Sequence, residues 1–319
     1  MIVRFINKYL LLNNMKKVVD IKSKRWLSIL LTVMAVIFVV FVLLPLSLSM
    51  FSSESGNIAL IPIEGPITGN GGNYLGDSTA SSKTIVSFIE SAEENKNVEV
   101  IVLEINSPGG SAVASDEIAT AVKNAKKPVV SLIREVGASG GYWIASASDY
   151  VVANRMSITG SIGVISSYIE FSELMDKYGV NYQRMVAGEK KDLGTPFKKL
   201  SSEDELLLQK KLDKIHQFFI EEIAENRGLS VSEVKALATG EFYLGIEALD
   251  LGLVDLLGNK DTLENYIQTE YDIEEISYSV YQEDTDLFGA LFGVFEDMSF
   301  NIGEGIGSIF VKSNNFMLT

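Results

Sequence analysis

Between residues 58 and 226, short apolar runs alternate with segments whose apolar residues recur every three or four positions. The short runs predict buried strands, whereas the spacing of three or four predicts amphipathic helices. This alternation predicts an α/β core with crossover helices rather than a β-sandwich or a helix bundle. A Gly-rich stretch up to Ser82 predicts a loop. The predicted strands span 58–63, 98–105, 129–133, 150–153, 162–167 and 181–186, and the predicted helices span 85–93, 112–124, 142–147 and 202–226.

The segment 202–226 has the clearest helical pattern of the chain. Ser202 and Glu205 have the spacing of a capping box at its start. His216, the single histidine of the sequence, lies beside the apolar stripe of this helix, and that placement predicts a partly buried side chain rather than a catalytic one. The stripe consists of Leu208, Leu212, Ile215, Phe219 and Ile223.

A longer apolar run stands near the N-terminus. Residues 27–44 form 18 consecutive positions without a charged side chain, and a membrane-spanning helix needs about 17–25 such residues. The preceding segment carries seven basic residues and one acidic residue, which predicts that it lies in the cytoplasm. We therefore expect a basic cytoplasmic segment over 1–25, a transmembrane anchor over 26–50, a linker over 51–57, an extracytoplasmic domain over 58–282 and an apolar, Gly-containing tail over 283–319.

A cleaved signal peptide is the competing interpretation of this run. Ser47 and Ser49 have the small-x-small spacing of a cleavage site. The apolar core of a signal peptide usually spans about 7–15 residues, however, and this run is longer. Its length favours an uncleaved anchor.

Composition limits the chemistry that the chain can perform. It has no cysteine and one histidine, which excludes disulfides and thiolate metal sites and disfavours a histidine metal cluster. The net charge is −15, whereas nucleic-acid binding requires a basic surface, so we expect no nucleic-acid partner. Catalysis, if present, must use Ser, Thr, Lys, Tyr or carboxylate side chains.

Three motifs of small residues follow predicted strands: NSPGG at 106–110, GASGGY at 137–142 and TGSIGV at 159–164. Adjacent glycines at a strand-to-helix turn expose backbone N–H groups that can stabilise an oxyanion. Ser139 stands among glycines at the start of a predicted helix, where its hydroxyl is approachable. Each motif alone is compatible with an ordinary tight turn, but three in one α/β core predict a site built from the backbone.

A nucleophilic serine needs a base, and the only histidine is poorly placed for this role. A lysine can replace it when burial makes the amine neutral. Lys190 and Lys191 stand together in the predicted loop 187–194, and the residues alone do not choose between them.

The ordered set of motifs resembles the signal peptide peptidase A family in its short, single-repeat bacterial form. The resemblance runs from about residue 58 to 267 and rests on NSPGG, ASGGYW at 138–143, TGSIGV, KD at 191–192 and GEFYLGIEALDLGLVDLLG at 240–258. It implies a ClpP/crotonase-like core behind an N-terminal transmembrane helix. It also implies a membrane-bound serine endopeptidase that uses a Ser–Lys dyad and needs no metal or cofactor.

The resemblance assigns roles to individual residues. Ser139 matches the nucleophile, and Lys191, 52 residues later, matches the general base. Ser161 matches the hydroxyl that orients this lysine. The oxyanion-hole turn matches Gly109 and Gly110, together with the N–H of Gly140.

The family also implies partners. Its substrates are signal peptides left in the membrane after cleavage, or other extended apolar peptides. Its members form ring-like homo-oligomers in which neighbouring domains can complete one another's sites, so the dyad can form within one chain or between chains. The apolar segments 288–295 and 316–318 of the tail resemble such substrates. They either enter an active site and restrain it, or pack on their own domain.

Three other functions remain open at this point. Gly137, Ser139 and Gly141 also match the nucleophile elbow of α/β-hydrolases, which would require His216 as the base. A crotonase-like enzyme that stabilises a thioester enolate is a second alternative, although an extracytoplasmic domain has little access to acyl-CoA. A non-catalytic membrane scaffold is the third.

Overall fold

The computed structural model describes residue 26 and residues 29–43, 56–74 and 77–282. The chain divides into two compact units, 1–55 and 56–319. In the first unit, residues 29–38 are α-helical and continue into a π-helical turn, η1, at Val39–Leu43. Within the described ranges, no helix has both the length and the hydropathy that crossing a membrane requires. Residues 27–28 and 44–50 of the predicted anchor and the whole C-terminal tail lie outside the described residues.

The second unit is built on a predominantly parallel sheet. Among the described residues, eight strands form this sheet in the order β10-β7-β6-β5-β1-β11, with β8 paired to β6 and β9 paired to β8. Only the β8–β9 pair is antiparallel. The strands are β1 (Ile58–Glu64), β5 (Val100–Ser107), β6 (Val129–Ala138), β7 (Tyr150–Ala153), β8 (Ile158–Gly160), β9 (Phe242–Leu244), β10 (Leu256–Leu257) and β11 (Tyr278–Val280).

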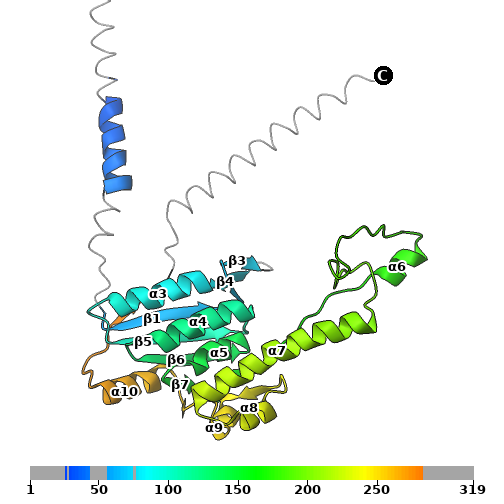
Figure 1. The fold of residues 1–319 in the computed structure, drawn as a ribbon. Coiled ribbons are helices and arrows are strands. Elements are labelled where there is room, and N and C mark those ends of the chain that lie inside the picture. The colour runs from blue at the N-terminus through cyan, green and yellow to red at the C-terminus, as the bar shows by residue number, and fades with distance from the viewer. Residues whose placement is uncertain (1–25, 27–28, 44–55, 75–76, 283–319) are drawn as a thin grey trace, which may run out of the picture. The chain divides into compact units, whose positions relative to one another are not determined.

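Helices cover both faces of the sheet, because alternate side chains of each strand point to opposite faces. Ile101, Leu103 and Ile105 of β5 pack with residues of α3, α4, α5 and α7 in one apolar cluster. Val100 and Val102 pack on the other face with α10, and Figure 1 shows this layered arrangement. The helices are α3 (Ser82–Glu94), α4 (Ala112–Asn124), α5 (Gly140–Ser146), α6 (Ser172–Lys177), α7 (Ser202–Arg227), α8 (Val231–Leu237), α9 (Gly245–Asp250) and α10 (Lys260–Tyr271).

The predicted α/β alternation is confirmed for β1, β5, β6, β7 and the four predicted helices. The strand predicted at 162–167 is wrong. The strand is β8, which ends at Gly160, because Gly160 and Ser161 both have positive φ (72° and 51°) and turn the chain out of the ladder. The strand predicted at 181–186 is also wrong, since this segment has exposed side chains and pairs with no described strand.

Two smaller predictions also change. The stretch before Ser82 is not simply a loop, because β2 (Ile67–Thr68), β3 (Gly72–Tyr74) and β4 (Asp77–Ser81) pair there into a small sheet. These strands are stabilised by pairing with one another, which local composition does not reveal. Helix α7 is capped one residue earlier than predicted: the extended Ser201 accepts the N–H of Asp204 through its hydroxyl at 3.1 Å.

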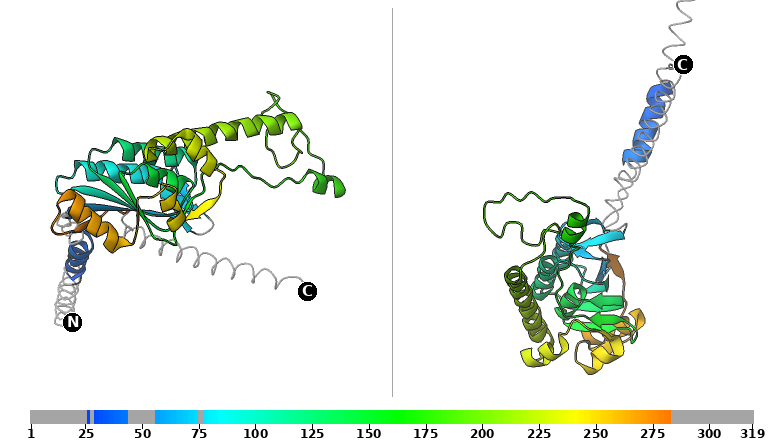
Figure 2. Two further views of the ribbon diagram at one scale, coloured as in Figure 1. Left: turned by 90° about the horizontal axis from the view of Figure 1, so that it is seen from below. Right: turned by 90° about the vertical axis from the view of Figure 1, so that its right-hand side faces the viewer.

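Residues 165–200, here called the arm, leave the sheet and extend beyond the N-terminal end of α7 (Figures 1 and 2). Apart from the short helix α6, the arm has no regular helix or strand. Its large apolar side chains face solvent in the single chain, with Ile165 86% and Met185 93% exposed. Such an exposed apolar segment is typical of a surface that contacts a partner.

A buried ion pair fastens the C-terminal end of α7 to the core. Both terminal nitrogens of Arg227, whose side chain is only 7% exposed, donate to the Asp255 carboxylate, at 3.0 and 2.6 Å. Asp255 also accepts the N–H of Val151 in β7 at 2.8 Å. One carboxylate therefore joins α7 to the sheet that carries the candidate site.

We predict that Asp255→Ala lowers the free energy of unfolding by about 3 kcal/mol or more, because it leaves a buried guanidinium without its partner. Denaturant unfolding measures this loss. The exposed pair between Glu104 and Arg134 (2.7 Å) supplies the control: Glu104→Ala should cost less than about 1 kcal/mol. Equal losses in the two variants would contradict the assigned role of Asp255.

Candidate active site

Ser139 lies at the junction of β6 and α5 in a strained backbone conformation. Its φ of 52° and ψ of −121° lie outside the regions that a serine normally adopts. Its N–H donates to the carbonyl of Gly160 at 2.8 Å, and its own carbonyl accepts the N–H of Trp143 at 2.9 Å. Backbone bonds on both sides therefore hold Ser139 in this conformation, as is common at functional sites.

Glycines are required around Ser139 because backbones approach closely there. A Cβ on Gly140 would lie 2.2 Å from the Ser115 hydroxyl oxygen, and one on Gly109 would lie 2.6 Å from the N atom of Gly140. Gly109 also has a φ of 96°, which favours glycine. The turn 106–110 and the start of α5 are therefore in direct contact.

Two backbone N–H groups beside Ser139 are available to an oxyanion. Within the described residues, neither Gly110 nor Gly140 donates its N–H to another group. A Cβ on Gly140 would lie 3.3 Å from the N atom of Gly110, so the two residues are neighbours. The N–H of Gly109, in contrast, donates to the Ser107 hydroxyl at 3.1 Å. The geometry therefore favours Gly110 and Gly140 as donors and gives Gly109 the role of shaping the turn.

Ser107 and Asn106 were not assigned roles by sequence reasoning, and both support this turn. The Ser107 hydroxyl donates to the carbonyl of Gly65 at 2.7 Å while it accepts the Gly109 N–H. The Asn106 side-chain oxygen accepts the N–H of Val136 at 3.2 Å, where the pairing of β5 with β6 is irregular. Their presence in NSPGG was the only signal in the sequence.

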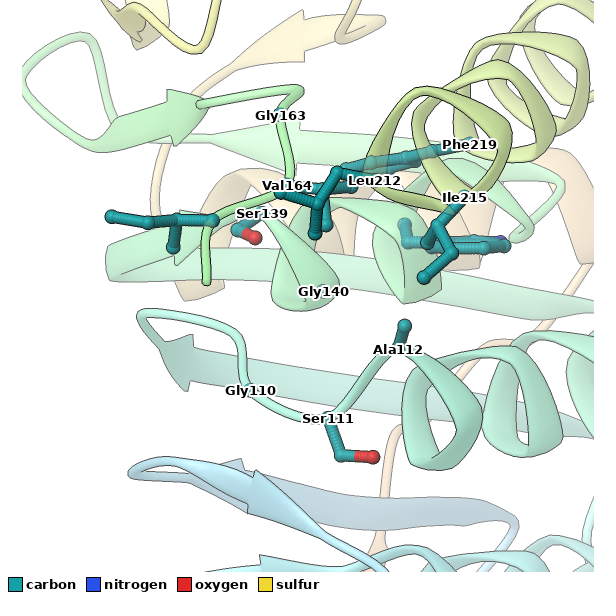
Figure 3. A pocket seen from close by; sticks show the side chains of 12 residues that line it. Gly110, Ser111, Ala112, Ser139, Gly140, Gly163, Val164, Leu212, Ile215 and Phe219 are labelled. Carbon is teal, nitrogen blue, oxygen red and sulfur yellow. The ribbon is translucent and has the colours of Figure 1, made fainter. Parts of the chain in front are cut away.

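Ser139 opens onto an apolar cavity of about 350 Å³. In Figure 3, its hydroxyl lies between the segment with Gly163 and Val164 and the turn with Gly110. Helix α7 supplies an apolar wall, and Trp143 stacks on Phe219 with ring centroids 4.6 Å apart. This cavity suits an apolar side chain next to the bond under attack. It is lined by Gly110, Ser111, Ala112, Ser139, Gly140, Trp143, Gly163, Val164, Ile165, Leu212, Ile215 and Phe219.

Ser161 belongs to the same constellation of turns. It directly follows Gly160, whose carbonyl accepts the Ser139 N–H. Its own φ of 51° is held by the bond from its N–H to the Glu241 carbonyl at 2.9 Å, and its hydroxyl donates to the Gly240 carbonyl at 3.3 Å. A hydroxyl that donates to a carbonyl keeps its lone pairs free to accept a bond from a lysine.

No lysine lines this cavity in the single chain. Lys190 and Lys191 both lie on the arm, and they differ in their contacts. Lys190 donates to Asp204 at 2.7 Å and approaches Glu203 at 3.2 Å, and these hydrogen bonds, chiefly that to Asp204, raise the pKa of Lys190. Lys191 is exposed and makes no ion pair with a described residue. The amine of Lys190 is therefore occupied by carboxylate partners, whereas the amine of Lys191 has no ion-pair partner among the described residues.

His216 makes no hydrogen bond with Ser139. Its Nε2 atom lies 3.2 Å from the carbonyl oxygen of Ile162, and His216 does not line the cavity. The prediction of a partly buried helical histidine is confirmed. The α/β-hydrolase alternative therefore lacks its base at Ser139.

Several known proteins are similar to this chain in sequence. The model of peptidase family S49 matches residues 121–274. A protein of Methanocaldococcus jannaschii named as a protease is 33% identical over 229 residues, which cover 70% of this chain and 72% of that protein. The chain belongs to peptidase family S49. It is a serine-type peptidase.

Two further relatives support this S49 assignment. A protein of Enterococcus faecium named as a signal peptide peptidase of the SppA type is 31% identical over 75% of this chain and 70% of that protein. Protease 4 of Haemophilus influenzae is 33% identical over 63% of this chain, but the match covers only 33% of that longer protein. The resemblance inferred from the motifs is confirmed.

We predict that Gly140→Ala lowers kcat of this S49 peptidase by roughly 10²–10³-fold, the cost of losing one oxyanion-hole donor. The added methyl group would collide with Ser115 and displace the amide from Gly110. Steady-state cleavage of an apolar peptide measures the effect. Gly69→Ala is the control, because a Cβ there meets nothing within 4 Å. Unchanged kcat in a folded Gly140→Ala variant would contradict the predicted displacement of this amide by the Ser115 contact.

Proposed function

We propose that this S49 peptidase is a membrane-anchored endopeptidase that degrades cleaved signal peptides or other apolar peptides through a Ser139–Lys191 dyad. The observation that carries the proposal is the position of Ser139: a strained turn beside two available N–H groups, at the mouth of an apolar cavity. An apolar cavity favours substrates with apolar side chains. The Enterococcus faecium relative, named as a signal peptide peptidase, suggests the same substrate class.

In the proposed mechanism, neutral Lys191 accepts the proton of the Ser139 hydroxyl as its oxygen attacks a peptide carbonyl. The N–H groups of Gly110 and Gly140 stabilise the oxyanion, and the amide bond breaks to give an acyl-enzyme. Lys191, now an ammonium, protonates the leaving amine. Water then hydrolyses the ester, with Lys191 again as the base and Ser161 orienting its amine.

The dyad is proposed to form between two copies of the chain. Lys191 is absent from the lining of the cavity that contains Ser139, and it lies on an arm that extends beyond α7. The exposed apolar side chains of the arm need a partner surface, and a neighbouring copy supplies one. A homo-oligomer, ring-like in form, would bring the Lys191 of one copy to the Ser139 of the next.

The remaining parts of the proposal concern placement at the membrane. Residues 26–50 would anchor the chain, the basic segment 1–25 would face the cytoplasm, and a ClpP/crotonase-like domain over 58–282 would act on the other side. The uncharged run over 27–44 supports an anchor by its length. An anchored enzyme meets membrane-embedded peptides at high local concentration.

The full chain in detergent, assayed with a fluorogenic apolar peptide, tests the dyad. We predict that Ser139→Ala and Lys191→Ala each lower kcat by roughly 10³-fold or more, because the two groups act as a unit. His216→Ala, which removes the only histidine, should retain most of the activity. Lys190→Ala removes an ion pair beside Lys191 and should therefore cost some activity, but far less than Lys191→Ala. Loss of activity in His216→Ala with retention in Lys191→Ala would instead favour the α/β-hydrolase mechanism.

Mixing the two inactive variants tests whether the dyad is shared between copies. An oligomer assembled from Ser139→Ala and Lys191→Ala chains contains sites with an intact serine from one chain and an intact lysine from the other. Recovery of activity on mixing supports the shared dyad. No recovery in an oligomer shown to contain both chains would place the dyad within one chain.

A further inference from the structure

The loop that carries Lys191 is closed by its own backbone. The N–H of Lys191 donates to the Gly188 carbonyl at 3.0 Å, and the N–H of Thr195 donates to the Asp192 carbonyl at 3.0 Å. Between these two bonds, the N–H of Leu193 donates to the Lys190 carbonyl at 3.2 Å. Although the arm has little regular structure, residues 188–195 therefore form a compact series of turns.

Arg184 braces this loop from outside. Its Nε and Nη2 atoms donate to the two carboxylate oxygens of Asp192 at 2.6 and 2.8 Å, and Nη2 also donates to the Glu189 carbonyl at 2.8 Å. This forked pattern requires a planar guanidinium, because a lysine amine cannot match both carboxylate oxygens and the carbonyl. A single side chain thus holds the residue after Lys191 and the backbone two positions before it.

The Arg184–Asp192 pair is charged throughout the pH range in which a peptidase is assayed. The hydrogen bonds from Arg184 lower the pKa of Asp192 to about 2, from an ordinary value of about 3.9. Because the folded-state pKa is lowered, the stabilisation is complete above about pH 4 and is lost only as the pH falls towards 2. The Asp192 side chain is only 10% exposed, which limits screening by solvent.

Lys190, the residue before Lys191, is also held by an ion pair. Lys190 is paired with Asp204 in the first turn of α7, and the Asp204 side chain is only 9% exposed. Ion pairs thus immobilise the residues on both sides of Lys191. Lys191 itself is exposed and pairs with no group in the described part of the chain. The arrangement fixes the backbone and leaves one amine free.

We propose that Arg184 is a positioning residue for the general base: paired with Asp192, it holds the loop in the conformation from which Lys191 reaches Ser139. The inference rests on the proposed Ser139–Lys191 dyad. Proton transfer requires hydrogen-bond distance between the two groups, and a displacement of about 1 Å can cost roughly 10²-fold in rate. The Arg184–Asp192 pair affects the reaction only through the position of Lys191.

Steady-state kinetics of the full-length oligomer test this proposal. We predict that Arg184→Gln lowers kcat roughly tenfold to hundredfold while KM changes little, because Arg184 does not line the substrate cavity. Asp192→Asn should do the same. The double variant should lose less than the two single losses combined, because both substitutions break the Arg184–Asp192 bond. Each also breaks a second contact, that of Arg184 with the Glu189 carbonyl or that of Asp192 with Lys198. Lys199→Gln, which removes an exposed ion pair of the same arm with Glu173 (3.7 Å), is the control and should leave kcat unchanged.

A second measurement separates positioning of Lys191 from general support of the arm. In the mixed oligomer, the Ser139→Ala chain supplies the lysine and the Lys191→Ala chain supplies the serine. Arg184→Gln should lower the recovered activity when it is placed on the first chain and not when it is placed on the second. Equal losses in both placements would overturn the proposal, since a defect in assembly affects either chain.

The outcomes for this inference and for the proposed function are distinct. Wild-type kcat in Arg184→Gln, with Lys191→Ala inactive, would overturn the role of Arg184 and leave the dyad intact. Full activity in Lys191→Ala would overturn the dyad itself. Additive losses in the double variant would show that Arg184 and Asp192 do not act as a pair.

Discussion

The hydrogen bond from the Ser139 N–H to the Gly160 carbonyl is the constraint on which the site depends. It holds a serine in a left-handed conformation at the end of β6, and it brings the Ser139 and Ser161 turns together. Close contacts at the same junction leave no room for a Cβ at 109, which would meet the Gly140 N atom, or at 140, which would meet the Ser115 hydroxyl. The available N–H groups, Ser139 and Ser161 are therefore brought together by the packing of the segments that follow the strand ends.

The strained turn at Ser139 is stabilised by the packed core around it. Ser139 stands between a sheet covered on both faces and a helix, α5, that packs against α4 and α7. Helix α7 then has two functions, since its middle forms the apolar wall of the cavity and its C-terminal end is fastened by Arg227 and Asp255. Stability and substrate binding are coupled through this helix.

The residues of the proposed dyad lie in two different settings. Ser139 and the proposed oxyanion donors, Gly110 and Gly140, lie just beyond the ends of β5 and β6, whereas Lys191 lies on an arm whose apolar side chains face solvent in the single chain. Such a division is consistent with an enzyme that becomes competent on assembly. The ion pairs around Lys191 give that arm local order where helices and strands are lacking, because charge-assisted hydrogen bonds can replace a regular backbone ladder.

The sequence by itself determined the α/β alternation, the three glycine motifs and the family, because hydrophobic periodicity and the glycine requirement of tight turns are local properties. It misplaced strands at 162–167 and 181–186, since apolar residues in an exposed arm have the same pattern as a buried edge strand. The residues alone left Lys190 and Lys191 equivalent, and the family resemblance favoured Lys191. Only the tertiary structure reveals their different contacts, because folding brings Asp204 to Lys190 and Arg184 to the backbone beside Lys191. Ion pairs between residues distant in the sequence, and the absence of a lysine from the serine's own cavity, depend on folding in three dimensions.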